Sequence, residues 1–331
     1  MPFFTILIED TSPLLKFSPK WTPGTSADDP LLDKYSESSF MKSNVQGESM
    51  SFTFNGTGLT IVGAKRGNHG LYSVNLDGID SPALNGSSPT DLMNQTLFSS
   101  VQLQRDTHSV VLTNEKQAFV DVDYVSIEVD IGEENEDLIV NSYQDANPIF
   151  SYTPASAWAT TPDSVGSFSG SSGRYVLLKL YVNAISVLVY LTKIQGDGIA
   201  VYGPVGPQMA TSYNVQIDNG PMTSFSANRV SYRAQQIIFM AVNLGPGSHL
   251  LSMTLGDSGR ELAIDYANVF TTASLGGRCV IQVINRTWSS AHCFHDPATS
   301  QLGQVLRVPL IPRLRQHLQL PHHTFHIYPA V

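Results

Sequence analysis

Three aspartates recur at matching positions in the two halves of the chain, and recurring carboxylates are the first candidates for acid–base chemistry. The pairs are Asp10 and Asp145, Asp77 and Asp218, and Asp123 and Asp265. Glycoside hydrolysis needs two facing carboxyl groups. However, Asp10 and Asp77 stand in turn-like contexts, where an aspartate bonds its own backbone, and Asp123 lies in a strand-like run, as a buried acceptor would. The sequence therefore favours structural roles, and we expect no catalytic residue.

Histidines also recur, as His108 and His249, each after a polar turn and before a strand-like run. A serine hydrolase would place a histidine beside a nucleophilic serine and an acid. The chain has no Gly-x-Ser-x-Gly elbow of the kind that carries such a serine. We therefore interpret both histidines as residues that fix their turns and not as general bases.

Aromatic and polar side chains near expected loops favour binding over catalysis, because sugars stack on aromatic rings and bond to polar groups. The candidate ligand-binding residues are Tyr232, Arg233, Tyr202, Tyr213 and Tyr72, with Asn68 and His69 as further polar groups. Tyr232 and Arg233 have no counterpart in the first half, which leaves them free for recognition. The alternative for Tyr72 and Tyr213 is a core ring with an exposed hydroxyl group.

Charge and cysteine content exclude several other partners. The net charge is −9 and neither half carries a basic patch, so we expect no nucleic acid partner. Near the C-terminus, the residue types that bind zinc are closely spaced on one side only, which fits a structural zinc site poorly. These residues are Cys279, His292, Cys293 and His295. We expect no metal and no cofactor. Candidate N-glycosylation triplets begin at Asn55, Asn85, Asn94 and Asn285.

The elements that position these residues are organised around a glycine-rich stretch that occurs twice. It reads Asn-Gly-Thr-Gly at 55–58 and Gln-Gly-Asp-Gly at 195–198, and a β-rich run closed by a further glycine follows each copy. The paired glycines predict a tight turn with positive φ, and the run predicts a strand. A phosphate-binding loop is disfavoured, because a strand and not a helix follows the turn.

The repeat extends over most of the chain. Matching residues follow in the same order about 140 positions apart, for example Trp21 and Trp158, Asp77 and Asp218, and Leu103 and Leu244. The chain therefore divides into two copies of one domain, at 1–131 and 138–270, joined by an acidic linker at 132–137. For the histidine-rich tail, residues 271–331, we expect an irregular or disordered structure.

Short apolar runs separated by glycine, proline, asparagine and aspartate fill each copy. In the first copy the predicted strands span 3–9, 50–54, 59–62, 71–76, 96–103, 109–113 and 120–129. This pattern predicts an all-β fold of two tandem antiparallel β-sandwiches. The second copy also has a long apolar segment at 175–193. We interpret it as two strands or as residues foreign to the domain, and not as a membrane span, because the domain continues after it.

These features resemble a large group of mostly uncharacterised fungal cell-surface proteins, especially from basidiomycetes, with tandem galactose-binding-domain-like β-sandwiches. The resemblance rests on an Asp-x-x-Pro opening at 10–13 and 145–148, on the Gly-x-Gly stretch and its strand, and on Asp-Tyr at 123–124 and 265–266. It covers roughly residues 5–270 and implies a jelly-roll strand order. Such relatives carry a signal peptide and a transmembrane helix. Residues 1–9 are too short and lack the basic start of a complete signal peptide, and we expect no clear transmembrane helix.

The sequence therefore predicts a non-catalytic glycan-binding or adhesion module, extracellular or at the cell surface, with cell-wall or extracellular glycans as expected partners. Two alternatives stay open: a carbohydrate-active enzyme or its ancillary domain, and a structural ectodomain without a small ligand. Two carboxylates about 5–9.5 Å apart in a cleft would favour the enzyme. An exposed aromatic platform would favour binding.

Overall fold

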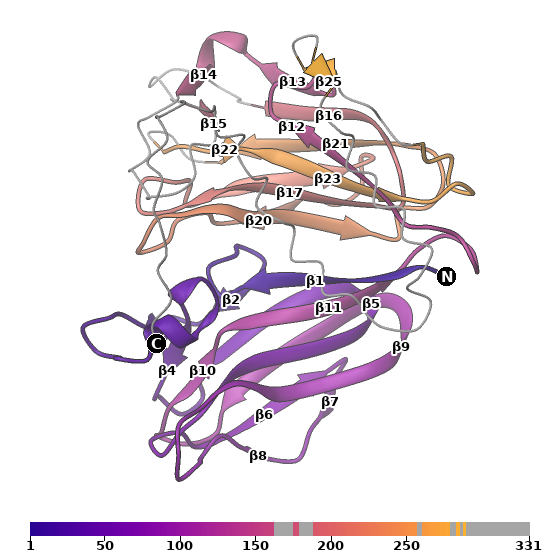
Figure 1. The fold of residues 1–331 in the computed structure, drawn as a ribbon. Coiled ribbons are helices and arrows are strands. Elements are labelled where there is room, and N and C mark those ends of the chain that lie inside the picture. Colours follow the sequence, from indigo (N-terminus) through magenta and orange to yellow (C-terminus); the bar gives the residue numbers. More distant parts are fainter. Residues whose placement is uncertain (162–174, 179–187, 257–259, 279–282, 285–286, 289–331) are drawn as a thin grey trace, which may run out of the picture.

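The computed structural model describes residues 1–161, 175–178, 188–256, 260–278, 283–284 and 287–288, and these residues form β-strands and loops almost exclusively. The helical elements of this part of the chain are three short 3-10 turns, η1 (Leu32–Lys34), η2 (Ser36–Ser38) and η3 (Ala155–Ala157). Every pairing between two named strands is antiparallel. The predicted all-β fold is confirmed, and Figure 1 shows two sandwiches stacked on each other.

The first sandwich contains the strands up to β11. They are β1 (Phe3–Glu9), β2 (Lys16–Phe17), β3 (Thr22–Pro23), β4 (Met41–Ser43), β5 (Ser49–Lys65), β6 (Leu71–Leu76), β7 (Ile79–Asp80), β8 (Leu84–Asn85), β9 (Leu92–Asn114), β10 (Val120–Val122) and β11 (Tyr124–Asp130). The main sheet has the order β1-β11-β5-β9-β6-β7, and a small sheet has the order β10-β4-β3. The bounds of β1 and β6 are those that the sequence predicts, whereas the predicted strand at 120–129 is split at Asp123.

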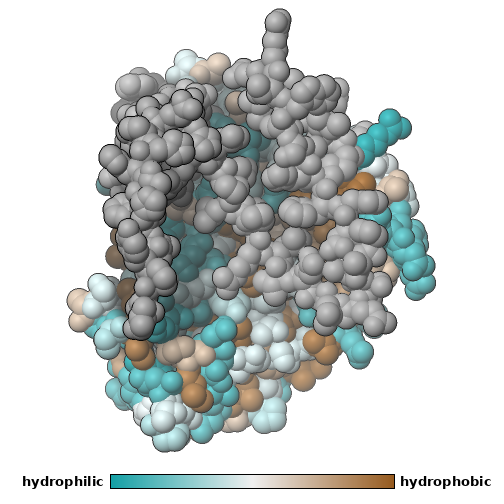
Figure 2. Space-filling view, viewed as in Figure 1, coloured by the Kyte–Doolittle hydropathy of each residue, from teal (hydrophilic) through white to brown (hydrophobic). Residues whose placement is uncertain are grey.

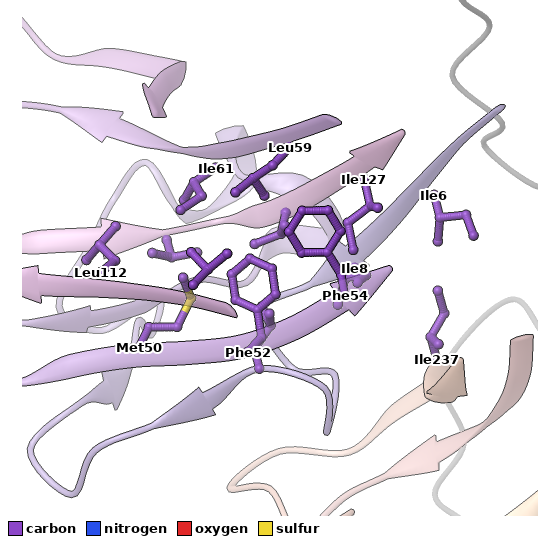
Figure 3. Packing of buried hydrophobic residues seen from close by; sticks show 14 of the residues in the cluster. Ile6, Ile8, Met50, Phe52, Phe54, Leu59, Ile61, Leu112, Ile127 and Ile237 are labelled. Carbon is purple, nitrogen blue, oxygen red and sulfur yellow. The ribbon is translucent and has the colours of Figure 1, made fainter. Parts of the chain in front are cut away.

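Strands β5 and β9 are long because each runs through both layers of the first sandwich. The first half of β5 pairs with the second half of β9, and the second half of β5 pairs with the first half of β9 and with β11. Both halves of β5 contribute side chains to one core: Phe52 and Phe54 come from the first half, and Leu59 and Ile61 from the second half (Figure 3). The predicted strands at 50–54 and 59–62 are therefore one strand, as are those at 96–103 and 109–113.

Neither copy of the glycine-rich stretch forms the tight turn with positive φ that the sequence predicts: the first copy is part of a strand, and the second has a bend at residues 196–197 between two strands. Gly56 and Gly58 lie inside β5, and neither has a positive φ. A Cβ atom on Gly56 would lie 2.4 Å from the Glu128 carbonyl oxygen, and one on Gly203 would lie 2.3 Å from the Ala263 carbonyl oxygen. The glycines are needed because neighbouring strands approach too closely for a side chain.

The second sandwich contains the strands from β12 to β23. They are β12 (Ile139–Gln144), β13 (Phe150–Thr153), β14 (Trp158–Thr161), β15 (Tyr175–Leu178), β16 (Leu188–Gln195), β17 (Gly198–Val205), β18 (Tyr213–Ile217), β19 (Thr223–Phe225), β20 (Arg233–Val242), β21 (Ser248–Leu255), β22 (Ala263–Ile264) and β23 (Tyr266–Thr271). Its sheets have the orders β12-β23-β17-β20, β13-β16-β21-β18-β19 and β14-β15-β22. Here the counterparts of β5 and β9 are each broken into two strands, β16 with β17 and β20 with β21.

The long apolar segment of the second copy contains strands β15 and β16, as one of the two sequence interpretations predicts, and its residues 179–187 lie outside the described residues. No described helix is long and apolar enough to cross a membrane. The chain stays packed beyond residue 270, since Asn141 Nδ2 donates to the Arg278 carbonyl oxygen at 3.1 Å. The predicted irregular tail includes a hairpin of β24 (Val283–Ile284) and β25 (Thr287–Trp288). Residues 289–331 lie outside the described residues.

One sheet of the second sandwich, β12-β23-β17-β20, is covered on both faces. Along β17, Ile199 and Val201 join the core of the second sandwich, whereas Ala200 and Tyr202 join the core of the first. Burial on both faces explains why the whole of β17 is buried and almost entirely non-polar. We call the contact between this sheet and the first sandwich the seam.

Apolar contacts fill the centre of the seam. The rings of Phe4 and Phe270 stack with their centroids 4.5 Å apart. Ile237 of the second sandwich lies near Ile6 of the first, in the same buried cluster (Figure 3). The two sandwiches therefore share one apolar core across the seam.

Candidate functional site

Polar side chains gather at one end of the first sandwich, where the turns after β5 meet those around β3, β4 and β10. Two isolated parallel bridges join these turns, Arg66 to Ser87 and His69 to Phe119. We call the group the polar end. Its members are Asp29, Tyr35, Lys42, Arg66, Asn68, His69, Asp91 and Asp121. In Figure 2, the visible surface of the first sandwich, in the lower half of the view, mixes hydrophilic with hydrophobic residues.

Asp121 is the centre of the polar end and is only 1% exposed. Its Oδ2 atom accepts a hydrogen bond from the Tyr35 hydroxyl group at 2.6 Å and lies 2.8 Å from His69 Nε2. Its Oδ1 atom accepts from the backbone N–H of Ala64 at 2.7 Å. Burial and the Asp121 charge raise the pKa of Tyr35 far above its ordinary value. The Tyr35 hydroxyl group is therefore a fixed donor.

Arg66 links the buried part of the polar end to its surface. Its Nη1 atom lies 2.5 Å from Asp29 Oδ2, and its Nε atom lies 3.3 Å from Asp91 Oδ1. The Asp29 side chain is 7% exposed, whereas that of Asp91 is 46% exposed. Arg66 thus holds one carboxylate inside and one at the surface, where a ligand can reach it.

The polar end contains two further groups that could contact a ligand, Asn68 and Lys42. Asn68 is exposed, and its Oδ1 atom lies 2.8 Å from His69 Nδ1. The Lys42 ammonium group lies 5.7 Å from the ring centroid of Phe119, which is half-buried. Both nitrogens of His69 face an oxygen partner, so neither is open to a ligand. The Lys42 side chain is 17% exposed, and its ammonium group lies 2.7 Å from Asp28 Oδ2. The exposed amide and carboxylate groups, with this half-buried ammonium group, suit a hydroxyl-rich ligand better than acid–base chemistry.

Among the described residues, the second copy lacks counterparts of three members of the polar end, Arg66, His69 and Asp121. The bridges of the first copy recur in the second between Gly206 and Asn228 and between Met209 and Glu261. Gly206 therefore stands in place of Arg66, and Met209 in place of His69. Gly63 and Gly203 each lie against one backbone carbonyl, that of Asp121 in the first copy and of Ala263 in the second. The second copy thus forms the same fold without counterparts of the Arg66, His69 and Asp121 side chains.

The recurring histidines do fix their turns, as the sequence predicts. His108 Nδ1 lies 2.6 Å from Asp77 Oδ2, and His249 Nδ1 lies 2.6 Å from Asp218 Oδ2. Burial alone would lower the pKa of His108, but the Asp77 carboxylate and a backbone carbonyl outweigh it and raise the pKa above its ordinary value. These aspartates accept from backbone N–H groups across the sheet and not from their own turn, which corrects the predicted local bond. Each pair clamps a turn to a neighbouring strand.

The other recurring carboxylates are buried acceptors. Asp10 Oδ1 accepts from the Ser39 hydroxyl group at 2.7 Å, and not from its own turn as the sequence predicts. Asp123 Oδ1 accepts from the backbone N–H of Ser36 at 2.9 Å, which confirms the structural role expected for it. Each of these two carboxylates is only 1% exposed. They are therefore not placed to reach a sugar at the surface.

Three of the predicted ligand-binding tyrosines lie inside the protein. Tyr72 and Tyr213 are 1% and 0% exposed, and their hydroxyl groups donate to backbone carbonyls at 2.8 Å and 2.5 Å. They are core rings, as the sequence alternative states, but their hydroxyl groups are buried as well. Tyr202 stacks on Tyr266 with ring centroids 4.3 Å apart, on the face of the sheet that meets the first sandwich. None of the three rings presents a face to solvent.

Tyr232 and Arg233 are half-buried and do not form an exposed loop site. A Cβ atom on Gly206 would lie 3.2 Å from the Tyr232 ring, so the tyrosine packs across this glycine. Arg233 begins β20, and its Nη2 atom lies 3.3 Å from the Ser38 carbonyl oxygen in the first sandwich. Ligand binding by this pair stays a prediction.

The candidate glycosylation sites differ in accessibility. Asn85 and Asn94 are exposed. Asn55 is half-buried in β5, where its side chain bonds Asn243 of the second sandwich. Asn285 lies outside the described residues. A glycan on Asn55 would therefore conflict with the seam, whereas Asn85 and Asn94 have room for one.

Among the residues that the structure describes, no group of three or more histidines, cysteines or carboxylates could hold a metal ion. The residues weighed for zinc, Cys279, His292, Cys293 and His295, lie outside the described part.

Sequence reasoning missed Asp29, Tyr35, Arg66 and Asp121, because their contacts join residues far apart in the chain. Arg66 and Asp121 could have been found as charged residues whose counterparts in the second copy, Gly206 and Ala263, are small and uncharged.

No protein-family model matches the chain, and no curated protein matches it. Among solved structures, the chain is similar to a xanthan lyase from Paenibacillus, with 12% identity and a TM-score of 0.30 over 77% of this chain and 25% of that one. It is similar to the CBM36-1 domain of a multidomain xylanase from the hindgut metagenome of Trinervitermes trinervoides, with 16% identity and a TM-score of 0.26 over 39% and 99%. It is also similar to the tandem CBM22-1-CBM22-2 domain of Xyn10C from Paenibacillus barcinonensis, with 8% identity and a TM-score of 0.25 over 78% and 93%. The chain spans 25%, 29% and 38% of three such structures. At these TM-scores the likenesses carry no argument about function.

Proposed function

We propose that this chain is a non-catalytic glycan-binding module that works outside the cell or at the cell surface, with the polar end as its binding site. The observation that carries the proposal is the difference between the two copies. Arg66, His69 and Asp121 stand in the first copy where the second copy has Gly206, Met209 and Ala263. Residues that served only the shared fold would tend to recur, so the polar end is free to serve recognition.

The chemistry of the surface groups fits the hydroxyl groups of a sugar. Asp91 offers acceptors, and Asn68 offers both donors and acceptors. Lys42 lies beside the ring of Phe119 and can offer the donors that its contact with Asp28 leaves over. The buried bonds to Asp121 fix the loops that carry these groups, so little ordering is needed when a ligand binds.

The recurring acids support a module without catalysis. Asp77 and Asp218 are bonded to histidines, and Asp10 and Asp123 are buried acceptors. None of these four is an exposed carboxylate without a partner.

The test is a glycan array probed with the full chain, followed by calorimetric titration of the glycan that binds best. We expect Asn68→Ala combined with Asp91→Ala to weaken this binding at least about tenfold, the scale of one lost hydrogen bond to a charged group. The matched control is Gln208→Ala, because Gln208 is the exposed residue of the second copy that corresponds to Asn68. It should bind like the wild type.

Three outcomes would contradict the proposal. Equal loss in the control would place the site elsewhere. Release of sugar from the bound glycan would favour a carbohydrate-active enzyme. Failure of the whole array to bind would favour a structural ectodomain.

A further inference from the structure

The turn at residues 36–39 is held to the first sandwich by three carboxyl groups. Glu9 Oε1 accepts from the Ser36 hydroxyl group at 2.8 Å, and Asp123 Oδ1 accepts from the Ser36 backbone N–H at 2.9 Å. Asp10 Oδ1 accepts from the Ser39 hydroxyl group at 2.7 Å. Both ends of the turn are therefore fixed by acids at the ends of the strands around it.

The same turn reaches across the seam to the second sandwich. Glu37 Oε2 accepts from Gln236 Nε2 at 2.8 Å, and Gln236 Oε1 accepts from the Thr11 hydroxyl group at 2.7 Å. Arg233 Nη2 lies 3.3 Å from the Ser38 carbonyl oxygen. Glu37 and Ser38 have φ values of 48° and 52°, a conformation that side-chain-bearing residues keep only where their surroundings impose it.

Acids outnumber cations around this turn. Its four carboxyl groups are those of Glu9, Asp10, Glu37 and Asp123. Two cations, Arg229 and Arg233, face them, and Arg229 already donates to two backbone carbonyls of the first sandwich. Glu9 Oε2 and Asp10 Oδ2 are buried and lack a hydrogen-bond partner within the described residues. The other titratable groups nearby are Asp121 of the first sandwich and Asp265 and Tyr266 of the second.

Burial raises the pKa of three of these acids above their ordinary values. It raises the pKa of Glu9 to about 8, with a contribution from the neighbouring Glu37 charge. It raises the pKa of Asp10 to about 7 and that of Asp123 to about 8. In the unfolded chain the same groups lose their protons near pH 4.

We propose that the seam is a proton-dependent joint, in which protonated carboxyl groups hold the turn at residues 36–39 against both sandwiches and their ionisation releases it. Ionised, the carboxyl groups of Glu9, Asp10 and Asp123 repel one another in a place where water reaches them poorly. Movement of the turn into water relieves that repulsion and breaks the contacts of Glu37 and Ser38 with the second sandwich. The seam then loosens.

The direction of the pH effect follows from proton binding. Each acid binds its proton more tightly in the folded than in the unfolded protein. The stabilisation is therefore complete below about pH 4 and is lost as the pH rises through about 7 to 8. The contact between the sandwiches should tighten in acid and loosen in base.

The test compares the full chain with Glu9→Gln combined with Asp123→Asn, in which uncharged amides replace two of the acids. Thermal unfolding and small-angle X-ray scattering are measured between about pH 5 and about pH 9. For the wild type we expect the unfolding midpoint to fall by more than about 5 °C over this range and the radius of gyration to rise. The variant should show a markedly flatter profile in both measurements.

The matched control is Asp33→Asn, because Asp33 lies in the neighbouring turn and its side chain is 69% exposed. It should keep the wild-type profile. A wild-type midpoint that does not fall as the pH rises would overturn the proposal. So would a variant profile as steep as that of the control, or a radius of gyration that stays constant.

Discussion

Asp121 accepts two hydrogen bonds and a histidine contact in a site that solvent does not reach. Replacing it by alanine leaves the Tyr35 hydroxyl group and the His69 ring without their acceptor. We expect Asp121→Ala to lower the free energy of unfolding by about 2–4 kcal/mol, because buried donors without partners keep their full desolvation cost. Urea denaturation followed by tryptophan fluorescence measures this change.

The control for this prediction is Asp106→Ala. Asp106 is exposed, and within the described residues its carboxylate accepts only from the adjacent Thr107 N–H group. Its replacement should change the free energy of unfolding by less than about 0.5 kcal/mol. Similar losses in the two variants would mean that water fills the place of the Asp121 carboxylate.

Residues of the fold and residues of the site differ in how far the sequence reveals them. His108 and His249 recur, and their role as turn clamps follows from the sequence. The role of Asp121 does not, because its partner Tyr35 is 86 positions away and the sequence holds no sign of that contact. Tyr202 was predicted to lie near a loop, but it is buried in the seam, for a related reason. The local sequence around a tyrosine does not show whether solvent or a second sandwich covers its ring.

Among the elements, two short strands were predicted to the residue, β1 from its apolar run and β6 from its alternation. Strands β5 and β9 were each predicted as two pieces, because local signals such as Asn55-Gly-Thr-Gly58 usually mark turns. What makes these glycines necessary lies in other strands, such as the Glu128 carbonyl oxygen beside Gly56. Such close approaches have no local signature.

The close approach at Gly203 gives a prediction at the scale of the strand. A Cβ atom there would lie 2.3 Å from the Ala263 carbonyl oxygen, so the backbone must move to admit it. We expect Gly203→Ala to lower the free energy of unfolding by about 3 kcal/mol, the upper end of the cost of overpacking. Chemical denaturation monitored by circular dichroism measures the loss.

Gly67→Ala is the matched control. Gly67 lies in an exposed turn, and the nearest atom to an added Cβ would be 3.6 Å away. It should leave the stability within about 0.5 kcal/mol of the wild type. If Gly203→Ala behaves like this control, the strands have room to separate and the close approach is not what requires glycine.

For the whole molecule, the seam makes the two sandwiches thermodynamically dependent on each other. Phe4 and Phe270 come from different sandwiches and stack at 4.5 Å. In a double-mutant cycle of Phe4→Ala and Phe270→Ala, we expect a coupling energy of about 0.5–1.5 kcal/mol, as for other aromatic pairs. Calorimetric unfolding of the four proteins measures it. A coupling near zero would show that the rings do not meet in solution.

The sheet covered on both faces, β12-β23-β17-β20, restricts how this pair of copies can evolve. A duplicated domain that keeps a solvent-facing surface can be moved by recombination into another gene and still yield a soluble product. The second copy cannot be moved in this way, because any protein that received it would have to cover Ala200, Tyr202 and Phe270 with a surface of its own. Selection therefore acts on the two copies as one heritable unit.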